Sequence, residues 1–262
     1  MNIIHLSDIH FGNPGSTFHH RKVAERLAGF INEQGCDSIL AISGDITFQG
    51  QKEGYDQGLD FFDVLFSKCG LERNNVIACP GNHDISSNSF NDFDRFIYSI
   101  RRDDQLSFSG HGLNVIEFDN VVFLILNTAY HVDHSYGLVD QSVLGDCPFG
   151  QYEEKIKVAM FHHHILGQFH SDTSAIRNSY NLVQWLVSNN VSYVFHGHQH
   201  SEQDYMIGAN GMRVFSVRSG NFLQPGHINA FNNYSFVGGE LCRRVFAFED
   251  TGGQVGIREV LS

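Results

Sequence analysis

Positive charge is scarce in this sequence. Its 262 residues include 17 Lys and Arg against 29 Asp and Glu, which gives a formal net charge of −12 with histidine neutral. Binding along the backbone of duplex nucleic acid depends on clustered Lys and Arg. We therefore expect no duplex nucleic acid partner, whereas a small anion held locally by metal stays compatible with this charge.

Long apolar runs and paired cysteines are also missing. No apolar run approaches the roughly 20 residues that a membrane-spanning helix needs. The first residues, MNIIHLSDIHFG, lack the basic and long apolar segments of a signal peptide. The five cysteines are widely spaced without a Cys-x-x-Cys pair, which argues against a disulfide framework or a cysteine zinc site. These features predict a reduced, cytoplasmic protein without a membrane partner, and they leave its oligomeric state open.

Apolar and aromatic residues are plentiful enough for a large core. They make up 42% of the chain, and 23 residues are Phe, so the bulk of the chain is not disordered. The length suits one core, because single cores stop growing beyond roughly 250–300 residues. We find no internal repeat and no linker rich in Pro, Gly or Ser. The sequence therefore predicts a single domain over residues 1–262.

Strand and helix patterns alternate along the chain. Apolar runs typical of buried strands lie at residues 3–6, 39–42, 76–79, 121–126, 156–161 and 193–195. Between the early runs, apolar residues recur at helical spacing over 23–31, 59–66 and 93–100. This alternation indicates an α/β sandwich with a partly parallel sheet.

Two further patterns indicate antiparallel structure. Residues 113–118 and 121–126 flank Asp119 and Asn120, which predicts a hairpin on a two-residue turn. Short strands with Gly-rich turns follow at 212–217, 244–249 and 254–260. We therefore expect residues 201–262 to complete the fold with β structure.

Histidine is the residue type in excess: the chain has 16, and about a third of that number is expected from average usage. Many of these histidines stand where a predicted strand ends, together with Asp and Asn. Five strands run in order into Asp8-Ile9-His10, Gly44-Asp45, Gly81-Asn82-His83-Asp84, His162-His163-His164 and Gly197-His198-Gln199-His200. The carboxyl ends of strands in an α/β sheet share one edge, so these side chains are expected to meet there.

Each motif alone also suits an ordinary turn, and Asp84 alone suits a helix N-cap. Ordinary turns do not account for all five motifs in this order, each at the end of a strand. The set resembles the calcineurin-like metallophosphoesterases over residues 8–200. That resemblance implies a four-layer α/β/β/α sandwich with mixed sheets and an enzyme that hydrolyses phosphoric esters with two divalent metal ions.

The resemblance also implies the ligands. Asp8, His10 and His200 would bind one ion, Asn82, His163 and His198 the other, and Asp45 would bridge both. The family has Pro two residues after its ligand histidine, where this chain has Ile165, so His162 stays an alternative to His163. His83 would aid the leaving group, with Asp84 orienting the nearby backbone or imidazole, while a metal-bridging hydroxide attacks phosphorus. His, Asn and carboxylate ligands suit Mn, Fe or Zn and do not identify the metal.

Differences from the motifs of known branches of this family narrow the class of substrate. Phe48 stands where the Ser/Thr protein phosphatases carry an acid and the purple acid phosphatases a ferric-binding Tyr. What remains is similar to the compact bacterial branch that includes cyclic-nucleotide and glycerophosphodiester phosphodiesterases. We therefore expect a small phosphodiester as substrate. A broad phosphomonoesterase or a nucleotide pyrophosphatase is the alternative, and a nuclease or an idle binding protein is less favoured.

Substrate contacts are expected from the loops after the strands. Residues 127–146 and 164–178 are long, polar loops, and residues 219–227 follow the last motif. The candidate substrate-binding residues in these segments are His164, Tyr130, His134 and Asn221, with His131, His170, Arg177 and His227 as further possibilities.

Overall fold

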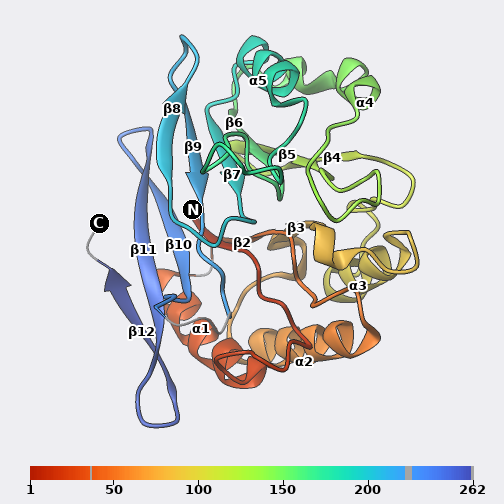
Figure 1. The fold of residues 1–262 in the computed structure, drawn as a ribbon. Coiled ribbons are helices and arrows are strands. Elements are labelled where there is room, and N and C mark those ends of the chain that lie inside the picture. The colour runs from red at the N-terminus through yellow and green to blue at the C-terminus, as the bar shows by residue number, and fades with distance from the viewer. Residues whose placement is uncertain (36, 222–225, 261–262) are drawn as a thin grey trace.

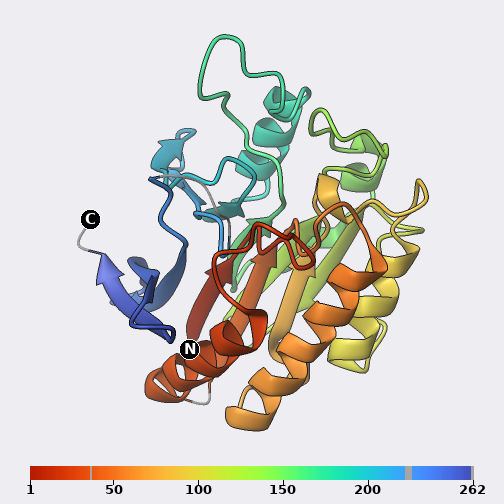
Figure 2. The ribbon, with the colours of Figure 1, turned by 60° about the horizontal axis from the view of Figure 1, so that its bottom comes forward.

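Two mixed sheets packed face to face form the centre of the molecule in the computed structural model, which describes residues 1–35, 37–221 and 226–260 (Figures 1 and 2). Cys36 lies outside the described residues, and the other four cysteines form no disulfide with one another. No helix in the described ranges is both long and apolar enough to cross a membrane.

The first sheet has the strand order β12-β11-β10-β1-β2-β3. Its strands are β1 (Asn2–Leu6), β2 (Ser38–Ser43), β3 (Val76–Cys79), β10 (Ala230–Val237), β11 (Glu240–Asp250) and β12 (Val255–Val260). β1, β2 and β3 are parallel, and β10 pairs with β1 in the antiparallel direction. The end of the chain therefore widens the sheet that the first strands begin.

The second sheet has the order β4-β5-β6-β7-β9-β8. Its strands are β4 (Leu113–Glu117), β5 (Val121–Leu126), β6 (Ile156–Met160), β7 (Tyr193–His196), β8 (Asp204–Ile207) and β9 (Met212–Ser216). β5, β6, β7 and β9 are parallel, while β4 and β5 form the predicted hairpin.

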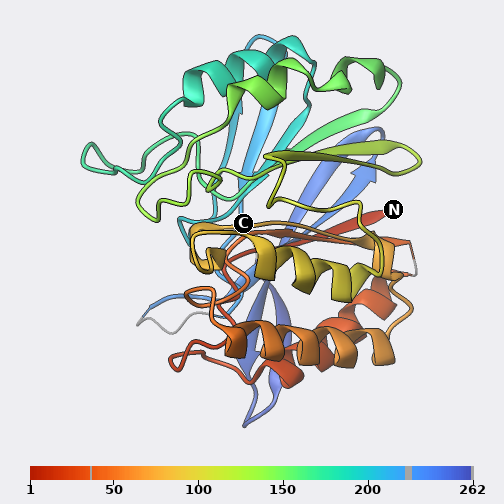
Figure 3. The same cartoon turned by 90° about the vertical axis from the view of Figure 1, so that its right-hand side faces the viewer.

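Helices cover the outer face of each sheet, which makes four layers (Figure 3). The α-helices are α1 (His20–Gln34), α2 (Lys52–Lys68), α3 (Asn91–Arg101), α4 (Gln141–Gly145) and α5 (Ser179–Ser188); the short 3-10 helices are η1 (Arg73–Asn75), η2 (Asn82–Asp84) and η3 (Pro148–Gln151). The first three α-helices pack on the first sheet, and α5 packs on the second through Leu182 and Leu186. The predicted four-layer α/β/β/α sandwich is confirmed.

Aromatic side chains fill the layer between the sheets. Phe195 of β7 is fully buried, and its ring stacks on that of Tyr234 from β10 with centroids 4.5 Å apart. The His5 ring of β1 also stacks against these two rings, with centroids 5.0 Å from Phe195 and 6.2 Å from Tyr234. Rings from both sheets thus lock the two sheets in one relative position.

The structure confirms the strands predicted at residues 3–6, 39–42, 76–79, 121–126, 156–161 and 193–195 to within a residue or two at each end, and it adds elements that the patterns did not indicate. Among these, β10 carries Asn232 and Asn233, a pair that is typical of turns. Both are buried in the sheet, where the Asn232 amide donates to Ser216 O and the Asn233 amide to Gln34 Oε1. Tertiary hydrogen bonds therefore override the local turn preference here.

The packing between the sheets predicts a large cost for Phe195→Ala. Removing a fully buried ring is expected to lower the free energy of unfolding by about 3–5 kcal/mol. Urea denaturation measures this change, and Tyr180→Ala is the control because that ring is 74% exposed. A loss below about 1 kcal/mol for Phe195→Ala would contradict the role given to this layer.

Candidate metal centre

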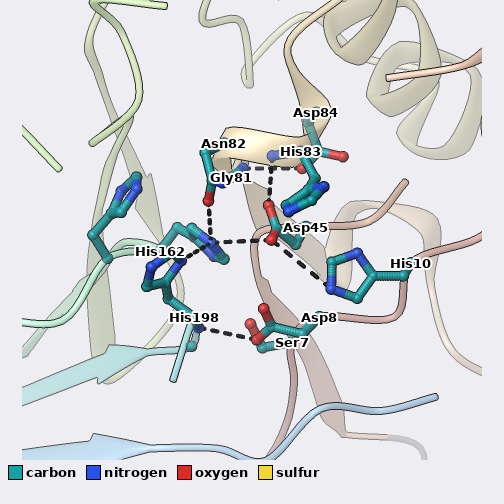
Figure 4. A network of polar contacts seen from close by, with 12 residues as sticks. Ser7, Asp8, His10, Asp45, Gly81, Asn82, His83, Asp84, His162 and His198 are labelled. Atoms are coloured by element: carbon teal, nitrogen blue, oxygen red, sulfur yellow. Dashed lines mark hydrogen bonds and ion pairs between the residues drawn. The ribbon is translucent and has the colours of Figure 1, made fainter. Parts of the chain in front are cut away.

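Loops that follow β1, β2, β3, β6 and β7 meet at one end of the sandwich, as the strand-end motifs predicted (Figure 4). They bring together two groups of side chains, each able to offer three ligand atoms within 4.8 Å of one another. One group is Asp8, His10 and His200, and the other is Asp45, His162 and His198. Each group draws residues from both sheets.

Asp8 organises the first group. Its Oδ1 lies 3.2 Å from His200 Nε2, and its Oδ2 accepts a hydrogen bond from the backbone N–H of His198 at 3.0 Å. The His10 ring lies edge-on to the His200 ring with centroids 5.6 Å apart. Asp8 and His10 are almost fully buried, so this group is closed on the side of the core.

Asp45 stands between the two groups. Its Oδ2 lies 3.9 Å from His10 Nε2 and 3.3 Å from His162 Nε2 (Figure 4). Its Oδ1 accepts the backbone N–H of His83 at 2.8 Å, which fixes the orientation of the carboxylate. Asp45 Oδ2 thus faces both groups, which is the position expected of a carboxylate oxygen that bridges two metal ions.

The second group converges on His162 Nε2. Asn82 Oδ1 lies 3.1 Å from this nitrogen and His198 Nδ1 lies 3.0 Å from it. A carboxylate, an amide oxygen and two imidazoles thus meet within a few ångströms, which is a ligand set that divalent transition metals accept. The residues present therefore fit a pair of metal ions.

His162, and not His163, reaches this group, which corrects the alignment that favoured His163. In β6, Val158 and Met160 face the layer between the sheets, whereas Ala159 and Phe161 face α5. His162 continues the inward alternation, and its Nδ1 contacts Ser43 O across the sandwich at 2.8 Å. His163 Nδ1 instead contacts Thr128 Oγ1 at 2.8 Å. Side chains alternate between the two faces of a strand, and continuing this alternation from Met160 to His162 identifies His162 as the inward-facing histidine.

The backbone adopts the left-handed conformation at five of these residues. Positive φ angles of 50–69° occur at Asp8, His10, Asp45, His198 and His200. Such a conformation costs roughly 1–2 kcal/mol for each residue other than Gly, and it clusters at functional sites. The fold therefore uses part of its stability to aim these side chains at one another.

Gly44 and Gly197 let the loops pass close to the side chains of the centre. Gly44 has φ +92°, and a Cβ there would lie 2.5 Å from His162 Nδ1. A Cβ at Gly197 would overlap Ser7 and lie 2.7 Å from Asp8 Oδ2. Both glycines, which the motifs singled out, are required by close approach.

The two buried carboxylates set the charge of the centre. Burial alone would raise the pKa values of Asp8 and Asp45, but the His200 and His162 imidazoles hold both pKa values well below the usual range. Burial likewise opposes the charged form of His162, yet Asp45 and Asp8 outweigh it and raise its pKa to about 9. The centre therefore favours positive charge between its carboxylates, as a cation site must.

His83 and Asp84 follow Asn82 in η2 and have different surroundings. The His83 ring lies edge-on to His10 with centroids 5.0 Å apart and is parallel to Phe48 at 6.0 Å. It is half-buried and borders the first group.

Asp84 is fully buried, and its carboxylate accepts backbone N–H bonds from Gly81, Ile46 and Thr47 at 2.9, 3.2 and 2.8 Å. These bonds tie the Asn82 loop to the Asp45 loop. Burial, and then the nearby Asp45 charge, raise the pKa of Asp84 to about 6 against the effect of these bonds. Of the predicted roles of Asp84, these bonds favour the orienting of the nearby backbone, because the fully buried carboxyl has no access to a substrate.

The predicted substrate-binding residues fall into three situations. His164 is fully buried beside His198, with ring centroids 5.5 Å apart. His134 is exposed and reaches the centre only through its backbone carbonyl, which accepts from Asn82 Nδ2 at 3.3 Å. Tyr130 is half-buried, and its ring lies 5.6 Å from that of His131. His227 approaches His200 with centroids 5.9 Å apart.

Asn221 has a different role from the one predicted. Its Oδ1 accepts the N–H of Phe18 at 2.8 Å and its Nδ2 donates to Phe18 O at 2.9 Å. Both ends of the amide are thus engaged in holding the chain near Phe18. Of the other loop residues, His170 is exposed, and the guanidinium of Arg177 lies 3.3 Å over the Tyr136 ring. Residues 222–225 of the last predicted segment lie outside the described ranges.

Comparisons with known proteins give the family. The sequence matches the family model of the calcineurin-like phosphoesterases over residues 1–202, and the chain therefore belongs to this family. Membership confirms the predicted class, a hydrolase of phosphoric esters. The family uses dinuclear metal centres, and the chain has two candidate metal-binding groups. A search of curated proteins returns no match.

Solved structures share the fold at low identity. A dimetal phosphatase from Danio rerio is 12% identical with a TM-score of 0.64, and the match covers 94% of this chain and 95% of that one. A purple acid phosphatase from yellow lupin (Lupinus luteus) is 12% identical with a TM-score of 0.58 over 98% and 52% of the chains. A phosphopantetheinyl hydrolase from Mycobacterium tuberculosis is 15% identical with a TM-score of 0.52 over 83% and 89%.

The hydrogen bonds of Asp84 predict a loss of stability for Asp84→Ala. The N–H groups of Gly81, Ile46 and Thr47 would lose their buried acceptor, so the free energy of unfolding is expected to fall by about 3 kcal/mol or more. Asp63→Ala, at an exposed position of α2, is the control and is expected to change it by less than about 0.5 kcal/mol. Equal stability of the two variants in urea denaturation would show that Asp84 does not join the loops.

Proposed function

We propose that the chain hydrolyses a small phosphodiester with two divalent metal ions bound between its sheets. The observation that carries this proposal is the pair of acid and imidazole groups that share Asp45. A shared carboxylate suits two ions about 3.5–4 Å apart, the spacing at which a metal pair assists in-line displacement at phosphorus.

In this proposal Asp8, His10 and His200 hold one ion, Asn82, His162 and His198 hold the other, and Asp45 contacts both. The ions, when bound, lower the pKa of water to near neutrality and neutralise charge on the phosphoryl oxygens. The oxygen and nitrogen ligands suit Mn, Fe or Zn.

Preference for a diester is supported by the charges around the centre. The pKa values of Asp8, Asp45 and His162 are shifted mainly by the charges of one another and of other histidines. No Lys or Arg of the described residues is among the main charges that act on these three groups. A phosphomonoester dianion gains more from added cationic side chains than a diester monoanion does. Arg218 acts on His227, whose ring lies 5.9 Å from that of His200, so the absence of such side chains holds for Asp8, Asp45 and His162 themselves, and there it suits the diester.

In this proposal His83 assists the leaving group. Its backbone is fixed by the bond to Asp45, and its ring contacts those of Phe48 and His10 at the edge of the first group. An imidazole at this position can hold a proton near the ester oxygen that departs. Phe48 gives this ring an apolar neighbour where related enzymes carry an acid or a Tyr.

The proposal is tested by assaying bis(p-nitrophenyl) phosphate and p-nitrophenyl phosphate in parallel, after chelation and after Mn(II), Fe(II) or Zn(II) is added back. We expect no turnover after chelation and a higher kcat/KM for the diester once metal returns. Faster turnover of the monoester would replace the diesterase proposal with a phosphatase.

The placement of the triple histidine predicts that His162→Ala and His163→Ala differ in metal content. Loss of His162 removes a proposed ligand, so this variant is expected to retain about one Mn per chain after dialysis. His163→Ala is the matched control and is expected to retain two. Elemental analysis of the dialysed proteins measures this ratio, and the opposite pattern would restore His163 as the ligand.

The position of His83 predicts that His83→Ala keeps its metal and loses rate. Loss of a proton donor is expected to lower kcat about 10²–10⁴-fold, while two ions stay bound. The effect is expected to shrink for esters with more acidic leaving groups, which need less help from a proton. A uniform loss across leaving groups would contradict the assigned role.

A further inference from the structure

A surface cleft of about 290 Å³ lies beside His198, between the loop of residues 165–174 and Gln199. We call it the His198 cleft. Its walls include Phe169, Asp172, His198 and Gln199. Because His198 belongs to the second metal group, a ligand in this cleft adjoins the proposed reaction centre.

A hydrogen bond between His164 and Asp172 holds the outer wall of the cleft. His164 Nε2 lies 2.8 Å from Asp172 Oδ2, and the His164 ring is parallel to that of His198. The same carboxylate accepts backbone N–H bonds from Gln168 at 2.9 Å and Ser174 at 3.0 Å. Asp172 thus fixes the loop to a buried histidine that packs on the centre.

Two further hydrogen bonds join the loop to the opposite wall. Gln199 Nε2 donates to Leu166 O at 3.3 Å, and Gln168 Nε2 donates to Ser201 Oγ at 2.6 Å. The loop is therefore held at both ends and at its middle. This cleft is preformed, as binding sites for small molecules usually are.

The chemistry of the walls selects an uncharged group. The Phe169 ring is 68% exposed and offers an apolar face. Gln199 Nε2 gives one N–H to Leu166 O, and because an amide nitrogen carries two, the second can be donated to a ligand. No Lys or Arg of the described chain lines the cleft, and its one acid, Asp172, is engaged within the loop. A second phosphate would find no cation here.

We infer that the His198 cleft receives the uncharged organic group of the phosphodiester, a nucleoside or similar ring-bearing alcohol, which stacks on Phe169 and accepts a hydrogen bond from Gln199. Asp172 acts as a positioning residue for this subsite. The inference rests on the proposed function and adds the residues that choose among diesters.

The test compares two diesters with the same leaving group on the Mn-loaded protein. Thymidine 5′-(p-nitrophenyl phosphate) carries a nucleoside, and methyl p-nitrophenyl phosphate carries a methyl group in its place. We expect the nucleoside ester to be favoured about fivefold or more in kcat/KM, mainly through KM, since stacking of a base on an aromatic ring contributes about 5- to 150-fold.

Variants then assign the preference to the cleft. Phe169→Ala and Asp172→Asn are each expected to reduce the preference to about threefold or less, with two ions still bound. Leu166→Ala is the matched control, because this exposed side chain of the same loop does not line the cleft and is expected to keep the full preference. Phe169 is exposed, so its variant tests the subsite even if Asp172→Asn does not fold.

The outcomes separate the two proposals. Equal turnover of both esters by the unchanged protein, or a full preference in Phe169→Ala, would overturn the subsite and leave the phosphodiesterase proposal intact. Turnover of neither ester with two ions bound would overturn the proposed function, and the subsite with it.

Discussion

The structure depends on the burial of two carboxylates, Asp8 and Asp45, where the two sheets meet. Burying a charge is costly unless positive charge or hydrogen bonds compensate for it. Here the compensation comes from the imidazoles around them and from the backbone N–H groups of His198 and His83. The raised pKa of His162 expresses the same demand for positive charge. Divalent cations meet this demand more fully than one protonated histidine does.

That demand is met by both sheets together. Asp8 and Asp45 follow strands of the first sheet, whereas His162, His198 and His200 follow strands of the second. The proposed ligands therefore come together only when the sheets pack through Phe195 and Tyr234. Metal binding at such a site is coupled to folding, because no ligand set is complete on one sheet alone.

Much of this was predictable from the sequence. Strand ends followed by Asp, Asn and His indicate a site at the carboxyl edge, and parallel pairing brings those residues to that edge, where the loops aim them at one another. Asp8, His10, Asp45, Asn82, His198 and His200 lie together for that reason. His162 was only the alternative to His163, because alignment on the residue after the triple took precedence over the alternation of the strand.

Other features depend on contacts that no local pattern indicates. The His164–Asp172 hydrogen bond spans a loop whose composition is merely polar, so the partner of His164 was not predictable. Asn221 has a side chain suited to a ligand, yet it holds the backbone of a segment some two hundred positions earlier. The buried asparagines of β10 are likewise accommodated by hydrogen bonds to residues far away in the sequence. Tertiary hydrogen bonding, rather than propensity, decides each of these cases.

The most direct measurement is a crystal structure of the Mn-loaded protein with anomalous data at the manganese edge. The account predicts two anomalous peaks about 3.5–4 Å apart, one among Asp8, His10 and His200 and one among Asn82, His162 and His198, with Asp45 between them. A single peak, or peaks away from these residues, would contradict a dinuclear centre at the meeting of the two sheets.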